Sequence, residues 1–196
     1  MPKTTIESVS RTPSRASAGR SGDSRGASPR RLVWVAIGLG ANLGNVRRAI
    51  LTAARALSRV LRAPRLSHLY RTSPVGGPAQ PDFLNAALVG KTTLSAKALL
   101  ALLRKLETAA GREPGGTRNA PRPLDLDLLL YGSRRVATPR LQVPHPRMTS
   151  RLFVLVPLAD IAPRRVVPGT GKTVARFLAE DRRRSTESVR RARASF

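Results

Sequence analysis

The sequence predicts an α+β fold in one domain at residues 32–181. Two observations support this: four segments have the apolar patterns typical of strands, and two have apolar residues at helical spacing. Their order along the chain is β-α-β-β-α-β, which is the ferredoxin-like split βαβ pattern of a two-layer sandwich. A short final helix at 174–178 adds an extra C-terminal helical segment.

The first half of the pattern runs from residue 32 to residue 70. Apolar and small side chains alternate from 32 to 40 and predict the first strand. A turn cluster at 40–45 then leads into a helix over 46–60, which Pro64 closes. The second strand is expected at 66–70, and a long loop follows it.

The second half begins with a strand over 83–89. Ser95 is a good N-cap for the second helix, in which leucines recur at helical spacing until Gly111 ends it. After a loop rich in Pro and Gly, the fourth strand is expected at 124–131.

The composition excludes several kinds of site. The chain of 196 residues contains no cysteine, which rules out disulfides, thiolate metal sites and cysteine nucleophiles. Only two histidines are present, which disfavours zinc. No apolar run approaches the roughly 20 residues that a membrane span needs. We therefore expect no membrane association and a cytoplasmic location.

The chain is strongly basic, with a net charge of +25. Residues 1–31 are rich in Ser, Arg, Gly and Pro and are expected to form a disordered basic extension, with a transit peptide as the alternative. Residues 182–196 are expected to form a disordered basic tail, and both ends to be dispensable for chemistry. Most of the positive charge remains in the domain between them and predicts an anionic ligand.

Two glycine-rich motifs resemble nucleotide-binding loops without fitting them. Residues 38–44 read G-x-G-x-x-x-G, so the third glycine comes one residue late for a dinucleotide fingerprint, and no acidic residue lies between Asp23 and Asp82. Residues 169–173 look like the end of a Walker A loop, but Val166 stands where its first glycine belongs. The sequence thus argues against a Rossmann fold and a P-loop.

Asp125 and Asp127 are the strongest local signal. On a strand they point to one face with Cα atoms about 6.6 Å apart, while the flanking leucines take the other face. Two such carboxylates repel each other, and a hard cation such as Mg²⁺ relieves the repulsion, with waters and substrate phosphates completing its shell. The alternative is an exposed pair of carboxylates on a solvent-facing strand.

Cations surround this pair in the sequence. They are Arg112, Arg118, Arg122, Arg140, Arg147 and Arg151. Arginine binds phosphate through two parallel hydrogen bonds. His145 lies between two prolines, which hold its backbone rigid, and its ring could donate to a phosphate oxygen. Metal carboxylates with a collar of arginines are what phosphoryl transfer requires.

Several motifs occur together in the order and spacing of one family. They are G-x-N-L-G at 40–44, Y-R-T-x-P at 70–74, Q-P-D-F-L-N-A at 80–86, P-R-x-L-D-L-D at 121–127 and V-P-H at 143–145. Over residues 35–163 the chain resembles the 6-hydroxymethyl-7,8-dihydropterin pyrophosphokinases of folate biosynthesis. The resemblance implies a soluble enzyme with a ferredoxin-like fold. It would be a monomer that transfers the diphosphate of ATP to the pterin hydroxymethyl group, releases AMP and uses two Mg²⁺ ions.

The resemblance also implies roles for individual residues. Those matching the metal ligands are Asp125 and Asp127, which act with Arg112 and Arg122 as catalytic residues. Those matching the pterin pocket are Thr72, Val75, Phe83, Asn85 and Phe153. Those matching the ATP site are Glu107, Leu128, Arg140, His145 and Arg151. The expected partners are these two small molecules, with no specific nucleic acid.

The chain departs from the family pattern in one loop, and two other functions remain open. Pro114 stands where the family often has an arginine, and 119–120 reads Asn-Ala where it has Trp-Gly. Ferredoxin-like sheets also bind RNA through stacked aromatics, but four Phe and two Tyr without an RNA-binding signature argue against this alternative. An inactive or bifunctional pterin enzyme is the other alternative.

Overall fold

The computed structural model describes residues 31–74, 79–112 and 120–192. The predicted extension at 1–30 lies outside the described residues. The strands are β1 (Val33–Ala41), β2 (Arg62–Leu66), β3 (Tyr70–Thr72), β4 (Phe83–Thr92), β5 (Asp125–Tyr131), β6 (Val136–Thr138), β7 (Leu141–Val143) and β8 (Val189–Arg191). The helices are α1 (Val46–Ser58), α2 (Ala96–Ala109), a 3-10 turn (Met148–Ser150), α3 (Leu152–Ile161) and α4 (Val174–Asp181).

The main sheet has the strand order β5-β1-β4-β3-β8, and β2 also pairs with β4. β1 lies between β4 and β5 and runs antiparallel to both. Because β1 and β5, the first and last strands of the split βαβ unit, lie side by side, this strand order confirms the prediction of a ferredoxin-like α+β fold. β6 and β7 form a separate hairpin.

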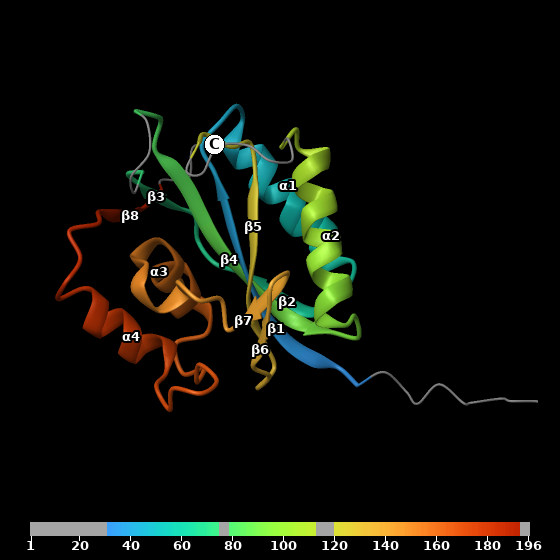
Figure 1. Cartoon of the computed structure of the whole chain (residues 1–196). Helices are drawn as coiled ribbons and strands as arrows, with labels where there is room; N and C mark the ends of the chain where they lie inside the picture. The colour runs from blue at the N-terminus through green and yellow to red at the C-terminus, as the bar shows by residue number, and fades with distance from the viewer. Residues whose placement is uncertain (1–30, 75–78, 113–119, 193–196) are drawn as a thin grey trace, which may run out of the picture.

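Helices cover both faces of this sheet (Figure 1). Side chains of β1 such as Ile37 pack with Ile50 of α1 and Leu103 of α2 in one core. On the other face Ala36 and Leu129 pack with Leu155 of α3 in a second core. α3 and α4 provide the extra C-terminal helical segment that the sequence predicts.

Local capping explains where α1 and α2 begin. The side chain of Asn45 accepts a hydrogen bond from Arg48 N at 3.0 Å, and that of Ser95 accepts one from Ala98 N at 3.2 Å. Both helices place their apolar stripes toward the sheet, as their spacing predicts.

The second predicted strand is wrong in its bounds. Residues 62–66 and 70–72 form strands instead of 66–70, and 67–69 lie outside both. The hydroxyl of Ser67 accepts from Ala87 N at 2.9 Å, and His68 N donates to the carboxylate of Asp160 at 2.9 Å. Side chains thus take hydrogen bonds that a continuous ladder would use.

The prediction of a disordered tail is wrong for part of residues 182–196. Val189–Arg191 pair with β3 as β8, while 193–196 lie outside the described residues. The apolar run at 152–161 forms α3 despite Pro157, because most of its side chains are buried against the sheet and α4. Among the described residues, no helix has the length and apolar character to span a membrane.

Candidate active site

The floor of the candidate site is the end of β1 that carries Gly38 and Gly40. Gly40 lies directly opposite Asn85 of β4 and Asp125 of β5, and Gly38 lies opposite Asp127. Residues directly opposite in an antiparallel pair share a face, so the amide and both carboxylates point to the same side. A Cβ at Gly40 would lie 3.0 Å from Asn85 Oδ1 and 3.9 Å from Asp125 Cβ. The glycine therefore leaves an open strip between β4 and β5.

Asp125 and Asp127 project from this face of β5, as their spacing predicts. Their side chains are 28% and 39% exposed, while the neighbouring Leu124, Leu126 and Leu128 are buried in the core on the other face. The two carboxylates are thus accessible to a ligand and are backed by a rigid, apolar strand.

Two arginines converge on Asp125. Arg112 Nη1 donates to Asp125 Oδ1 at 2.7 Å, and Arg122 Nη1 lies 3.1 Å from the same oxygen. Burial acts to lower the pKa of Arg112, but the charges of Asp125 and Glu107 outweigh it and raise that pKa. Both cations are therefore fixed at one edge of the carboxylate pair.

Glu107 lies behind these groups at the end of α2 and is buried. Its carboxylate accepts from Leu126 N at 2.8 Å and also from Arg112 Nη1. Burial raises the pKa of Glu107, against the hydrogen bond from Leu126. The residue that the resemblance assigns to the ATP site thus anchors Arg112 to β5.

His145 faces the other carboxylate. Its backbone N–H donates to Leu129 O at 2.9 Å, which fixes it along the outer edge of β5. Its Nε2 lies 3.9 Å from Asp127 Oδ1, and its Nδ1 accepts from Arg147 N at 3.3 Å. Because Nδ1 accepts, the neutral ring carries its proton on Nε2. Burial lowers the pKa of His145, although the charge of Asp127 opposes this.

The donor set fits a magnesium ion. Burial and the charge of Asp125 raise the pKa of Asp127, whereas Asp125 already pairs with Arg112 and Arg122, so the charge of Asp127 is the one that a bound cation would stabilise. Among the described residues, no three His, Asp or Glu side chains gather as a metal cage. Mg²⁺ commonly takes one or two carboxylates and completes its shell with water and substrate phosphates. The two carboxylates are sufficient for that mode of binding.

The other side of the floor carries neutral groups. Asn85 Nδ2 donates to Thr72 Oγ1 at 2.8 Å, and both side chains are buried. Phe83 lies two residues before Asn85 on the same strand, opposite Thr72 of β3, and is half-buried. These three predicted pterin-pocket residues therefore share one face of β3 and β4.

Phe153 lies in the first turn of α3 and is half-buried. The guanidinium of Arg151 lies 5.2 Å from the centre of its ring. Burial and the charge of Arg147 lower the pKa of Arg151. Cations crowded at the start of α3 favour an anion there.

Two predicted site residues are placed away from the others, and a third lies outside the described residues. The side chain of Leu128 is buried in the core on the opposite face, so only its main chain can face a ligand. Arg140 is exposed in the turn between β6 and β7. Val75 lies outside the described residues.

Asn42 is a connecting residue to which the sequence analysis gave no role. Its buried side chain donates to Gln80 Oε1 at 2.8 Å and accepts from Arg122 N at 2.8 Å. It thereby joins the loop before β4 to the backbone of Arg122. Its position inside the turn cluster at 40–45 is the sequence feature that could have indicated this connecting role.

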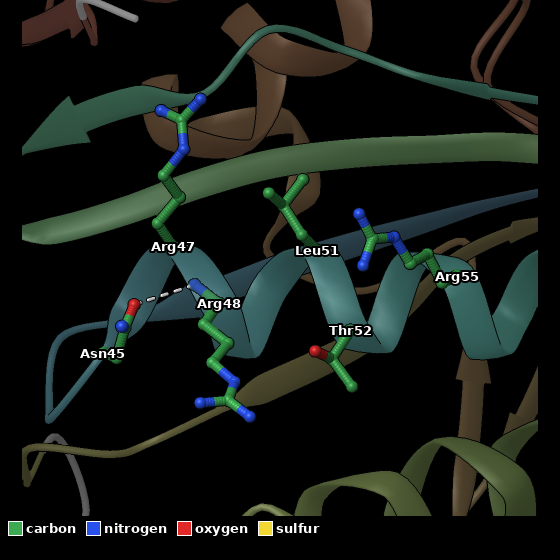
Figure 2. A pocket seen from close by; sticks show the side chains of 6 residues that line it. All are labelled: Asn45, Arg47, Arg48, Leu51, Thr52 and Arg55. Carbon is green, nitrogen blue, oxygen red and sulfur yellow. Dashed lines mark hydrogen bonds between the residues drawn. The ribbon is translucent and has the colours of Figure 1, made fainter. Parts of the chain in front are cut away.

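A separate hollow lies on the outer side of α1 (Figure 2). It is lined by Asn45, Arg47, Arg48, Leu51, Thr52 and Arg55. None of these six residues is a carboxylate or a predicted site residue, so the hollow is distinct from the floor of β1.

Comparison with known sequences identifies close relatives of the described domain. The chain is 40% identical over 157 residues to the 2-amino-4-hydroxy-6-hydroxymethyldihydropteridine pyrophosphokinase of Synechocystis, covering 78% of each chain. It is 44% identical over 128 residues to the folate synthesis bifunctional protein of Arabidopsis thaliana. That match covers 65% of this chain and 26% of the plant protein, so the chain spans about a quarter of that relative.

Solved structures support the fold. A Plasmodium falciparum HPPK-DHPS crystal structure matches with a TM-score of 0.63 at 14% identity, covering 79% of this chain and 46% of that one. The family model for 7,8-dihydro-6-hydroxymethylpterin-pyrophosphokinase matches residues 36–163, which contain all the site residues placed above. With carboxylates, arginines and the Asn85–Thr72 pair on one face inside that range, the chain belongs to the 7,8-dihydro-6-hydroxymethylpterin-pyrophosphokinase family.

Proposed function

We propose that this protein transfers the diphosphate of ATP to 6-hydroxymethyl-7,8-dihydropterin, giving AMP and the pterin diphosphate, in folate biosynthesis. The observation that carries the proposal is the row Asn85–Gly40–Asp125 across three adjacent strands. It supports a neutral hydrogen-bonding site and a carboxylate site on one open face. Two substrates that exchange a phosphoryl group need to be held side by side in this way.

In the proposed reaction the pterin hydroxyl oxygen attacks the β-phosphorus of ATP. The new O–P bond forms as the bond between that phosphorus and the α–β bridging oxygen breaks, and the bridging oxygen leaves with AMP. The hydroxyl proton is released to solvent water. Positioning and neutralisation of charge supply most of the rate enhancement in such transfers.

The residues of the charged side bind the phosphates in this proposal. Arg112 and Arg122, fixed against Asp125, supply N–H donors to phosphate oxygens. His145 presents its Nε2 proton to the same region. Asp125 and Asp127 would hold two magnesium ions, and Mg²⁺ bound there would neutralise charge on the transferred group.

The residues of the neutral side orient the pterin. Asn85 offers both a donor and an acceptor to a heterocycle edge, and the Thr72 hydroxyl fixes its amide orientation. Phe153 and Phe83 are the aromatic side chains available for stacking on a flat ring. We further propose that the enzyme acts as a monomer in the cytoplasm.

The test is formation of AMP from ATP by the full chain, measured with and without 6-hydroxymethyl-7,8-dihydropterin and with and without Mg²⁺. We expect AMP release that requires all three components. Release of ADP or orthophosphate instead, or AMP release independent of the pterin, would contradict the proposal. An RNA-binding role, the alternative, predicts no AMP release at all.

A further inference from the structure

The C-terminal segment of residues 182–192 lies beside the neutral side of the site, outside the range that the family model matches. In Figure 1 it leaves α4, passes α3 and reaches β3, where β8 forms the edge of the sheet. It therefore contacts the two elements that carry Thr72 and Phe153. We call residues 182–192 the C-terminal clasp.

The first anchor of the clasp is Glu187. The N-cap residue of α3 is Arg151, and its side chain makes no capping hydrogen bond to the helix. Arginine has no hydrogen-bond acceptor, so the first amides of α3 need a partner from elsewhere. The carboxylate of Glu187 accepts from Leu152 N at 3.1 Å, and the neighbouring backbone N–H of Phe153 also acts to lower the pKa of Glu187.

This contact is favourable for two reasons. A carboxylate at a helix N-terminus is stabilised by the partial positive charge of the exposed amides. Glu187 also stands near Arg151, whose charge favours its ionised form, although burial raises the pKa of Glu187. The backbone at the start of α3, and with it Phe153, is thus held by a residue 35 positions away in the chain.

The second anchor is β8. Thr72 of β3 lies opposite Val189, and Ala192 N donates to Leu69 O at 2.8 Å. β3 has only three residues and pairs with β4 on one edge and with β8 on the other, so β8 adds main-chain pairing that helps to hold β3 in the sheet. Thr72 in turn accepts the hydrogen bond that orients the Asn85 amide.

We propose that the C-terminal clasp positions the pterin pocket of this protein, with Glu187 as the positioning residue that fixes Phe153 through the first amides of α3. This inference rests on the function proposed above. It assigns to the C-terminal segment a role in substrate affinity that its sequence, a run of arginines, does not suggest.

The test compares Glu187→Ala and Glu187→Gln with the wild-type full chain. Glu180→Gln is the matched control, because Glu180 also carries a charge and pairs with Lys172 and Arg176, away from the site. Pterin affinity without nucleotide is measured by calorimetry, and so is affinity for a non-hydrolysable ATP analogue. Hydrogen exchange at the amides of Leu152 and Phe153 is measured by NMR.

We expect Glu187→Ala to weaken pterin binding at least about tenfold, the scale for losing hydrogen bonds to a charged acceptor. Binding of the ATP analogue should change less, since Arg112 and Arg122 are untouched. Both amides should exchange faster. Glu187→Gln should recover part of the affinity, because its amide oxygen still accepts, and Glu180→Gln should match the wild type.

Two outcomes overturn the inference. One is unchanged exchange at Leu152 and Phe153 in Glu187→Ala, and the other is a pterin affinity equal to wild type in both Glu187 variants. Failure of the proposed function looks different, since the wild type itself would then neither bind the pterin nor release AMP. If Glu187→Ala does not fold, Glu187→Gln with the same two measurements decides.

Discussion

The two sides of the site are held together by different forces. On the β5 side, Asp125 is fixed by Arg112 and Arg122 through charged contacts of 2.7 and 3.1 Å. On the β3–β4 side, Asn85 is fixed by the neutral hydroxyl of Thr72 at 2.8 Å. The charged side can stabilise developing negative charge, whereas the neutral side can only orient a ring. We therefore propose that the first side governs turnover and that the second governs pterin affinity.

The largest effect should follow from Asp125→Asn or Asp127→Asn, which changes only the charged side. We expect kcat to fall at least about 10², the scale for losing a major electrostatic stabiliser. Pterin binding without nucleotide should be unchanged. The kcat of the double variant should be little lower than that of the less active single variant, because the effects of residues that act as one catalytic unit are not additive. Steady-state kinetics at several Mg²⁺ concentrations measure kcat and its dependence on Mg²⁺. Asp82→Asn serves as the control, because Asp82 is an exposed carboxylate.

Unfolding of the same two variants sharpens the contrast. Burial and Asp125 raise the pKa of Asp127, so its charge is unfavourable in the folded protein and Asp127→Asn should raise the melting temperature slightly without Mg²⁺. Asp125→Asn should not raise the melting temperature, because this variant loses the ion pairs of Asp125 with Arg112 and Arg122. Equal shifts in both variants would contradict the assigned contacts.

Gly40→Ala tests the strip between the two sides. The added methyl group would stand 3.0 Å from Asn85 Oδ1, which is too close without movement of that side chain. We expect kcat/KM for the pterin to fall about tenfold or more, a loss of about 1.4 kcal/mol in transition-state stabilisation. Gly38→Ala is the comparison, because its methyl group also faces the floor but would meet Leu129 at an ordinary 3.5 Å, so its effect should be smaller. Wild-type kinetics for Gly40→Ala would argue against the strip as the substrate floor.

Arg122→Ala should lower kcat/KM more than tenfold, over about 1.4 kcal/mol, if the side chain stabilises charge in the transition state. The backbone N–H of Arg122 bonded to Asn42 remains in this variant, so the loop should keep its place. Kinetics with both substrates varied separately should show the loss. An unchanged kcat/KM would make Arg122 a partner of Asp125 only.

Thr72→Val should change the neutral side alone. The variant keeps the volume but removes the acceptor of the Asn85 amide, at a cost of about 1–1.5 kcal/mol. We expect pterin affinity to fall about fivefold to tenfold, with the dependence on Mg²⁺ unchanged. A change in Mg²⁺ dependence would show that the two sides are coupled.

The smallest expected effect concerns the contact between α3 and the segment before β3. Burial acts to raise the pKa of Asp160, but hydrogen bonds from His68 and Tyr70 outweigh it and lower that pKa. The carboxylate therefore stabilises the fold above its unfolded pKa, and this contribution is lost as the pH falls through the folded pKa. Chemical denaturation from pH 7 down to pH 3 should show a steeper loss of stability in wild type than in Asp160→Asn, by about 1 kcal/mol or less.

The charged side was predictable because its signal is local. Asp125 and Asp127 lie two apart on one strand, and strand geometry alone places them on one face. The helices were predictable too, since Ser95 and the apolar stripe of α2 are readable within a few residues. The neutral side came from the family resemblance, because nothing local to Thr72 or Asn85 indicates that β3 and β4 bring them together.

Features that depend on distant partners were missed. The strand expected at 66–70 is interrupted at 67–69, where Asp160, far along the chain, accepts the hydrogen bond of the His68 amide. The tail from residue 182 has the composition of a solvated charge run. Nothing in the sequence around Glu187 and Val189 indicates that they contact α3 and β3. Our expectation that residues 182–196 are dispensable for chemistry stays a prediction, and the inference on the C-terminal clasp predicts the opposite for residues 182–192.

The open strip at Gly40 also fixes the distance between the two sides of the site. Strands in a sheet lie about 4.8 Å apart, so the backbone positions of Asn85 and Asp125, on either side of Gly40, are about 9.6 Å apart. Main-chain hydrogen bonds maintain this spacing, and side-chain substitutions cannot readily stretch it. The sheet thus fixes the separation between the amide that we propose for the pterin ring and the carboxylate that we propose for the phosphate chain.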